Sequence, residues 1–198
     1  MATSKHFYSV NIREFLAQEK IGEHKLLDLF SVFSCPQNID VENFLKRNSI
    51  EFTKKNQSVT YLVFPTDEIL PVGYFTITVK PLTINITDID SNTQRKKIER
   101  VCRLDTISQT YTMSAYLIAQ LGKNFTNELN KKISGKELLN TALDIVKKMQ
   151  YLAGGMIIFV ETENNTKLTH FYQQNNFHML EKRFENTHNE LLQLFRLL

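Results

Sequence analysis

A short segment near the middle of the chain combines residue types that suit an anion-binding site. Lys131 and Lys132 supply positive charge, Ser134 is a good helix N-cap, and Glu137 completes a capping box with it. Free backbone N–H groups and the positive end of the helix dipole converge at such a helix start. Gly135 adds no side chain that would block a ligand. The spacing predicts either a phosphate-binding helix start or a well-capped surface helix with two solvated lysines.

A second set of residues suited to proton transfer lies closer to the C-terminus. Tyr172 lies in an apolar-periodic segment, and His170 and His178 flank it. A buried tyrosine commonly just satisfies a hydrogen bond with its hydroxyl. Glu161 and Glu163 end a predicted strand, where active sites of parallel sheets collect. We expect both carboxylates to be surface groups, so the sequence identifies no general base.

Missing motifs count against several other chemistries. The chain contains no Gly-x-Ser-x-Gly segment, which disfavours a hydrolase of that type, and no P-loop, which disfavours NTPase chemistry. Cys35 and Cys102 are far apart and form no CxxC pair. We therefore expect two reduced thiols and no metal site.

The first half of the chain alternates helix and strand patterns. Residues 11–33 are apolar-periodic and partly helical, and Asp40 is placed to cap a helix that runs through Ile50. Residues 59–64 are β-branched and aromatic, and residues 72–79 alternate with period two. The turn between these strands is rich in proline, so we expect an antiparallel hairpin.

The next segments predict a parallel strand pair joined by a helix. Residues 85–111 are polar and charged, which indicates a solvated loop with a short helix or a substrate-facing segment. Residues 116–121 have the pattern of a buried central strand. The helix that begins at Ser134 leads through two glycines to a strand at 156–160. A strand–helix–strand unit of this kind places its strands parallel.

The C-terminal part is expected to hold one helix and two strands. Asn164 or Asn165 can start a helix that carries Tyr172. Residues 177–184 and 191–198 have strand patterns, although a helical period also fits the last segment.

Length and composition favour an ordinary globular chain. It has 198 residues, of which 42% are hydrophobic, enough for one core. The net charge of +3 fits an anionic cofactor or a nucleic acid without choosing between them. The first ten residues show no signal-peptide layout, and no apolar run has membrane-spanning length. We therefore expect a cytoplasmic protein with no membrane partner.

Three stretches together resemble the GNAT acetyltransferase superfamily. Residues 116–124 are similar to its central cofactor-binding strand, residues 130–139 occupy the place of its pyrophosphate loop, and residues 165–177 resemble its Asn-x-x-Ala/Leu-x-x-Phe-Tyr segment. Upstream residues extend the resemblance to roughly 33–198, toward a branch that includes toxin-like acetyltransferases of bacteria. The loop departs from the family pattern at Asn130 and Ile133.

The resemblance implies a fold, a cofactor and a set of site residues. The fold is mixed α/β: a twisted, mostly antiparallel sheet of six or seven strands with a splayed parallel pair, flanked by helices. It implies one domain over 1–198, with 1–32 as an N-terminal extension, and a homodimer through the C-terminal strands. Tyr172 would be the general acid. The residues implied to bind acetyl-CoA are Leu121, Gly122, Lys123, Lys131, Lys132, Ile133, Ser134, Gly135 and Asn165.

The implied reaction is N-acetylation of a primary amine by direct attack on the thioester, with the amine unidentified. One alternative is a toxin-like enzyme that acetylates aminoacyl-tRNA, which requires a basic face because each phosphate contact needs a cation. Glu99 and Asp105 interrupt the candidate cations. The other alternative, which the altered loop favours, is a non-catalytic acyl-CoA-binding module. The candidate cations are Arg95, Lys96, Lys97, Arg100 and Arg103.

Overall fold

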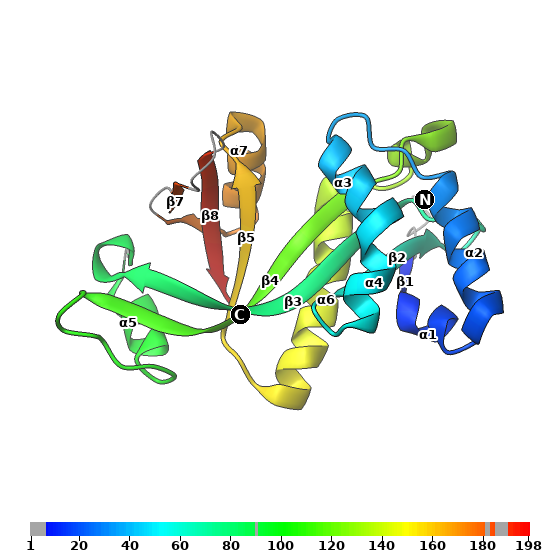
Figure 1. Ribbon diagram of the computed structural model, residues 1–198. Coiled ribbons are helices and arrows are strands. Elements are labelled where there is room, and N and C mark those ends of the chain that lie inside the picture. The colour runs from blue at the N-terminus through cyan, green and yellow to red at the C-terminus, as the bar shows by residue number, and fades with distance from the viewer. Residues whose placement is uncertain (1–6, 90, 181–182, 185–189) are drawn as a thin grey trace. The chain divides into compact units, whose positions relative to one another are not determined.

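The computed structural model describes residues 7–89, 91–180, 183–184 and 190–198 (Figure 1). Within these ranges the strands form one sheet in the order β1-β2-β3-β4-β5-β8-β6, with β7 paired to β8. The strands are β1 Phe7–Asn11, β2 Val59–Pro65, β3 Gly73–Asn85, β4 Thr110–Lys123, β5 Ile157–Glu163, β6 His178–Met179, β7 Arg183–Phe184 and β8 Glu190–Leu197.

Helices cover the sheet and connect its strands. The α-helices are α1 Ile12–Leu16, α2 Glu19–Ser31, α3 Ile39–Asn43, α4 Ser49–Lys54, α5 Asn92–Ile98, α6 Gly135–Ala153 and α7 Thr166–Gln174. The shorter turns are the π-helix η1 Phe44–Asn48 and the 3₁₀ helices η2 Ile86–Asp88 and η3 Thr126–Lys131. Within the described part of the chain, no helix combines the length and apolarity that crossing a membrane requires.

The chain divides into two compact units. Residues 1–78 and 119–145 form the first, and residues 79–118 and 146–198 form the second. Strands β3 and β4 and helix α6 contribute residues to both. The single domain predicted from the sequence stays a prediction.

The core of the first unit lies between the helices that precede β2 and one face of β2 and β3. Ile12 of α1 and Leu26 of α2 pack there against Leu62 of β2, and Tyr74 of β3 joins the same cluster. β1 pairs antiparallel with β2, Phe7 opposite Pro65. The first 32 residues therefore contribute a strand and two helices to this unit. The sequence patterns predicted the helices but not β1, a five-residue edge strand.

Helix α3 begins two residues earlier than expected. We predicted Asp40 as the N-cap, but the side-chain oxygen of Asn38 accepts from the backbone N–H groups of Asp40 (3.0 Å) and Val41 (3.1 Å). Asn38 is extended, with φ −151° and ψ 100°, as a cap residue must be, so the prediction is wrong. Asp40 instead lies in the first turn, where its carboxylate complements the helix dipole.

The second unit holds the predicted parallel pair. Tyr116–Ile118 of β4 lie opposite Ile158–Val160 of β5 in parallel register. β8 pairs antiparallel with β5 along the whole length of β5, so the helical alternative for the C-terminal segment is wrong. Because β8 hydrogen-bonds on both sides, to β5 and to β6 and β7, its apolar residues form a buried strand.

Two further predictions fall in the second unit. Residues 85–111 contain η2 and α5, as the polar composition indicated. Residues 177–184 form two two-residue strands in place of one continuous strand, and residues 181–182 lie outside the described residues. Asn176 takes the left-handed conformation with φ 64°, as expected for a residue standing in for glycine.

Candidate functional site

The loop between β4 and α6 is compact and hydrogen-bonded. β4 ends at Lys123, and η3 follows with Asn127 and Glu128 both in the left-handed region, φ 48° and 60°. Side-chain Nζ of Lys123 reaches back across the loop and donates to the carbonyl oxygens of Asn130 (3.0 Å) and Ile133 (3.4 Å). Lys123 thus holds the loop through two of its backbone carbonyl groups.

The predicted capping box is present at the start of α6. The Ser134 N–H donates to Oε2 of Glu137 at 2.7 Å, and the Glu137 N–H donates to Oγ of Ser134 at 3.1 Å. The Lys132 N–H is also engaged, by the carbonyl of Leu129 at 3.0 Å. Three backbone N–H groups near this helix start therefore already donate to acceptors within the protein.

Other donors of this loop remain available. Among the described residues, none accepts a hydrogen bond from the backbone N–H groups of Ile133, Gly135 or Lys136. Ile133, which stands where the family has glycine, does not have positive φ, and its side chain is buried with 1% exposed. It therefore packs inward and adds no backbone strain. The loop leaves fewer N–H groups without an acceptor than an uncapped helix start would.

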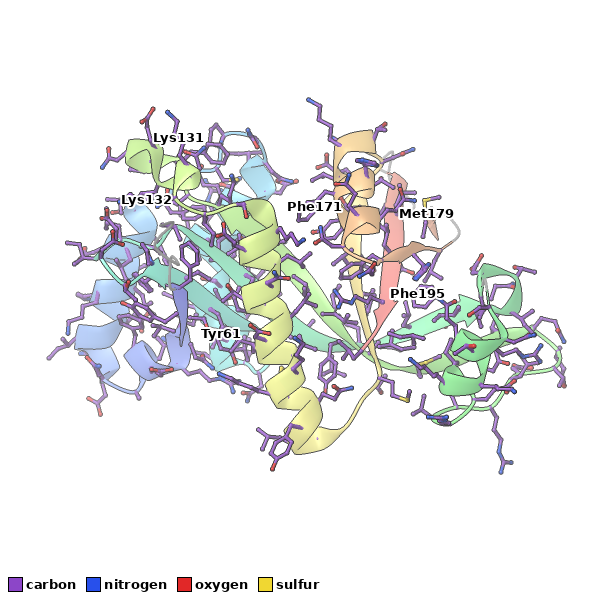
Figure 2. All side chains as sticks on the ribbon, turned by 180° about the vertical axis from the view of Figure 1, so that it is seen from behind. Tyr61, Lys131, Lys132, Phe171, Met179 and Phe195 are labelled. Atoms are coloured by element: carbon purple, nitrogen blue, oxygen red, sulfur yellow. The ribbon has the colours of Figure 1, made fainter. Side chains whose placement is uncertain are left out.

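The two lysines ahead of α6 are paired with carboxylates. Lys131 forms an ion pair with Glu128, and Lys132 forms one with Glu68. Figure 2 labels the two lysines in the loop ahead of α6. The hydrogen bond that the Lys132 ammonium donates to Glu68 is the main cause that raises the pKa of Lys132. An anionic ligand would have to share both lysines with these glutamates.

Gly122 is required by packing. A Cβ atom at this position would lie 2.4 Å from Cγ1 of Val41 in α3 and 3.4 Å from Cε1 of Tyr74. Only glycine lets the end of β4 approach α3 so closely. Leu121, the neighbouring residue, is half-buried. Contacts between an acyl-CoA and the backbone of Leu121, Gly122 and Lys123 stay predictions.

Tyr172 lies in α7 of the second unit and is buried, with 8% exposed. Its ring packs edge-on against Phe171 (centroids 5.1 Å apart) and Phe177 (5.5 Å). Burial raises the pKa of Tyr172 to about 12. The hydroxyl is therefore protonated at neutral pH, the state that a proton donor needs.

Asn165 caps α7, as one of its two predicted roles requires. Its side-chain oxygen accepts from the Lys167 N–H at 2.9 Å. A contact with the acyl-CoA arm stays a prediction. Asn165 and Tyr172 lie in the second unit, whereas the other candidate residues lie in the first.

Three of the other titratable candidates of the second unit have hydrogen-bond partners. His170 lies within 2.8 Å of Gln174, and His178 lies within 3.2 Å of Gln94. Glu161 accepts a hydrogen bond from the buried Gln193 at 2.7 Å. Sequence patterns gave no signal for Gln193, because its burial depends on β8 being enclosed on both sides. Among the described residues, no group of three or more His, Cys, Asp or Glu could hold a metal ion.

The basic segment around α5 is mostly solvent-exposed. Arg95 pairs with Glu99 at 2.9 Å, and Glu99 also accepts from the hydroxyl of Tyr111. Arg95, one of the five predicted basic positions, is thus paired with a neighbouring carboxylate. The exposed cations of the segment are Lys96, Lys97, Arg100 and Arg103.

Comparison with known proteins finds structural likeness and no sequence match. No family model and no curated protein matches the sequence. Among solved structures, AtaT complexed with acetyl-methionyl-tRNAfMet is 16% identical, with a TM-score of 0.64 over 94% of each chain. A tyrosine-to-phenylalanine mutant of KacT is 16% identical, with a TM-score of 0.63 over 98% of this chain and 95% of that one.

A further similar structure is AtaTR bound with AcCoA, 16% identical, with a TM-score of 0.57 over 96% of this chain and 92% of that one. The likeness spans almost the whole chain in each case. The mixed α/β fold that the GNAT resemblance implies is confirmed.

Proposed function

We propose that this protein is an N-acetyltransferase that transfers an acetyl group from acetyl-CoA to a primary amine. The observation that carries the proposal is the loop ahead of α6. In an acetyltransferase fold, it leaves the N–H groups of Ile133, Gly135 and Lys136 without an acceptor among the described residues. Such donors at a helix start suit a diphosphate. The similar AtaTR structure is bound with AcCoA.

In this proposal the loop binds and Tyr172 transfers a proton. The amine nitrogen attacks the thioester carbonyl carbon, the carbon–sulfur bond breaks, and the proton lost by the amine passes to solvent. The hydroxyl of Tyr172 gives its proton to the leaving sulfur and regains one from solvent. A hydroxyl whose pKa is about 12 remains protonated between turnovers.

Two measurements test the proposal in sequence. Acetyl-CoA at about 100 times its dissociation constant should stabilise the protein by about 2.7 kcal/mol, which a thermal shift detects. Release of the coenzyme A thiol in the presence of a panel of primary amines then tests turnover. No thermal shift at millimolar acetyl-CoA contradicts the proposal. A shift without thiol release on any amine supports a non-catalytic acyl-CoA-binding module.

A second, narrower candidate is acetylation of aminoacyl-tRNA. The exposed cations around α5 favour it, and the AtaT structure contains acetyl-methionyl-tRNAfMet. Each phosphate contact should add about 0.9 to the negative slope of log affinity against log salt. Reversing the charge of Lys97 and Arg100 (Lys97→Glu with Arg100→Glu) should flatten that slope for an aminoacyl-tRNA. It should leave the acetylation of a small amine unchanged. Equal salt slopes for variant and wild type contradict this candidate.

A further inference from the structure

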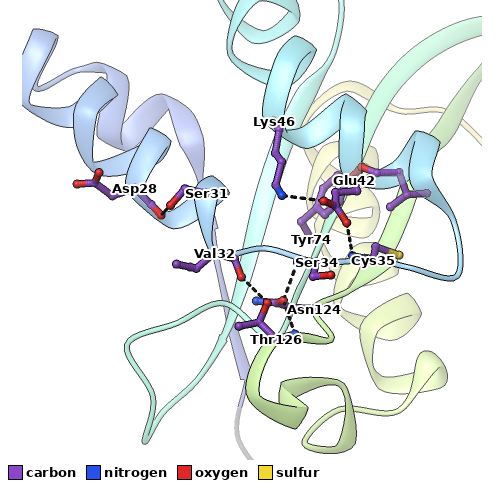
Figure 3. Close-up of polar contacts among 11 residues, drawn as sticks. Asp28, Ser31, Val32, Ser34, Cys35, Glu42, Lys46, Tyr74, Asn124 and Thr126 are labelled. Atoms are coloured by element: carbon purple, nitrogen blue, oxygen red, sulfur yellow. Dashed lines mark hydrogen bonds and ion pairs between the residues drawn. The ribbon is translucent and has the colours of Figure 1, made fainter.

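The buried side chain of Asn124 hydrogen-bonds three separate segments of backbone, and Figure 3 shows its bonds to two of them, at Ser34 and Thr126. Its Nδ2 donates to the carbonyl of Pro71 at 2.9 Å. Its Oδ1 accepts from the N–H of Ser34 and from the N–H of Thr126, both at 3.1 Å. The backbone N–H of Asn124 donates to the carbonyl of Val72 at 2.8 Å. One planar amide, 0% exposed, thus joins the end of β4 to the start of β3 and to the segment after α2.

Neighbouring hydrogen bonds extend this junction. The N–H of Phe125 donates to the carbonyl of Ser34 at 2.7 Å, and Oγ1 of Thr126 donates to the carbonyl of Val32. The segment that receives these bonds is itself held, because the N–H of Cys35 donates to Oε2 of Glu42 at 2.7 Å (Figure 3). Phe125 and Thr126 of the loop are therefore bonded to a segment that is itself held in place.

The loop needs such an anchor because its backbone is strained. Two successive residues that are not glycine, Asn127 and Glu128, have positive φ, which costs of order 1 kcal/mol for each. Such conformations persist where surrounding structure fixes them. The bonds of Asn124 fix the chain just ahead of these residues, and Lys123 fixes it just beyond them.

We propose that Asn124 is the positioning residue of the loop that presents the N–H groups of Ile133 and Gly135 to the coenzyme A diphosphate. This inference rests on the proposed acetyltransferase function. The side chain must accept two N–H bonds and donate one, a combination that an amide supplies and that a carboxylate or a methyl group does not. Donors held in place before the ligand arrives bind it more tightly, because less ordering is lost on binding.

Asn124→Ala tests the proposal. The dissociation constant for acetyl-CoA should rise by about tenfold, while kcat at saturating acetyl-CoA should stay within about threefold of the wild type. Thr76→Val is the matched control: Thr76 is also fully buried in the first unit and loses one side-chain bond, to Thr60 at 2.9 Å. Both variants should lower Tm, and only Asn124→Ala should weaken acetyl-CoA binding.

Hydrogen exchange supplies a readout that does not depend on turnover. The amides of Ser34 and Thr126 should exchange faster in Asn124→Ala than in Thr76→Val. Equal acetyl-CoA affinity and equal exchange in the two variants overturn the proposal. Should the alanine variant fail to fold, Asn124→Asp replaces it, because it loses the donor to Pro71 and keeps the acceptor. A rise of about threefold in its dissociation constant is expected, and an unchanged constant overturns the proposal.

Failure of this inference is distinguishable from failure of the proposed function. A wild type that does not bind acetyl-CoA contradicts the acetyltransferase proposal and, with it, the role of Asn124 toward coenzyme A. A wild type that binds acetyl-CoA, together with an Asn124→Ala variant that binds it equally well, contradicts only the positioning role.

Discussion

Tyr172 combines burial with a retained proton, and these two properties lead to a kinetic prediction. Tyr172→Phe removes one hydroxyl and keeps the ring that packs between Phe171 and Phe177. If the hydroxyl protonates the leaving sulfur, kcat should fall by about 100-fold. The KM for acetyl-CoA and the Tm should change little. Steady-state thiol release measures both constants, and an unchanged kcat removes Tyr172 from the chemistry.

The raised pKa of Tyr172 also predicts how stability depends on pH. An unfolded tyrosine ionises near pH 10, whereas burial raises the pKa of Tyr172 in the folded chain to about 12. The stability contributed by neutral Tyr172 is therefore fully present below pH 10 and is lost as the pH rises through this window.

Comparison with Tyr172→Phe isolates this contribution from the other tyrosines. Above pH 10, the free energy of unfolding of the wild type should fall relative to that of the variant by about 1.4 kcal/mol per pH unit. Urea denaturation below and above pH 10 measures the difference. Parallel pH dependences for the two proteins would mean that the hydroxyl is not buried in the folded state.

The start of α6 has backbone N–H groups that could bind an anion. It also has a carboxylate, that of Glu137, which would compete with a bound anion. Glu137 accepts the Ser134 N–H at 2.7 Å, at the end of the helix where the dipole favours negative charge. Glu137→Gln keeps an acceptor for the capping box and removes the charge. The dissociation constant for coenzyme A should fall by about threefold, equivalent to about 0.7 kcal/mol.

A matched variant separates this effect from general charge. Glu51→Gln removes an exposed carboxylate of α4 that pairs with Lys55 in the same unit. Isothermal titration of both variants with coenzyme A should show tighter binding only for Glu137→Gln. Weaker binding by Glu137→Gln would indicate that the carboxylate supports the loop more than it opposes the ligand.

The elements that were predictable from sequence are those whose signals are local. The capping box at Ser134 and the cap at Asn165 depend on residues two or three positions apart, so their spacing was sufficient. The cap at Asn38 was missed because Asp40 is an equally good cap by type, and only the backbone angles decide between them. β1 was missed because its partner, β2, lies some fifty residues further along the chain.

The candidate site was predictable to a similar extent. The donors around Gly135 follow from the helix start, but the three segments joined by Asn124 meet only in the folded chain. An asparagine directly after a long apolar strand was the available signal, since its short side chain readily bonds nearby backbone. That signal does not show which backbone groups it meets.

At the scale of the whole molecule, the N-terminal residues decide how the first unit is held together. Side chains of α1 and α2 are part of the core of this unit. In α2, Leu26 is 0% exposed, whereas its neighbour Leu27 is 47% exposed. Because the two leucines share α2, they offer a matched pair. Leu26→Ala should lower the free energy of unfolding by about 3 kcal/mol, and Leu27→Ala by about 0.5 kcal/mol.

The same pair tests whether the two units act as one domain. If they do, urea unfolding of the wild type is a single transition, and Leu26→Ala moves that entire transition to lower urea. Fluorescence and circular dichroism should then give coincident midpoints. Two transitions, of which Leu26→Ala moves only one, would mean that the units unfold independently. In that case acetyl-CoA, proposed to bind donors of the first unit, should stabilise only the transition that Leu26→Ala moves, because a ligand stabilises only the unit that it binds.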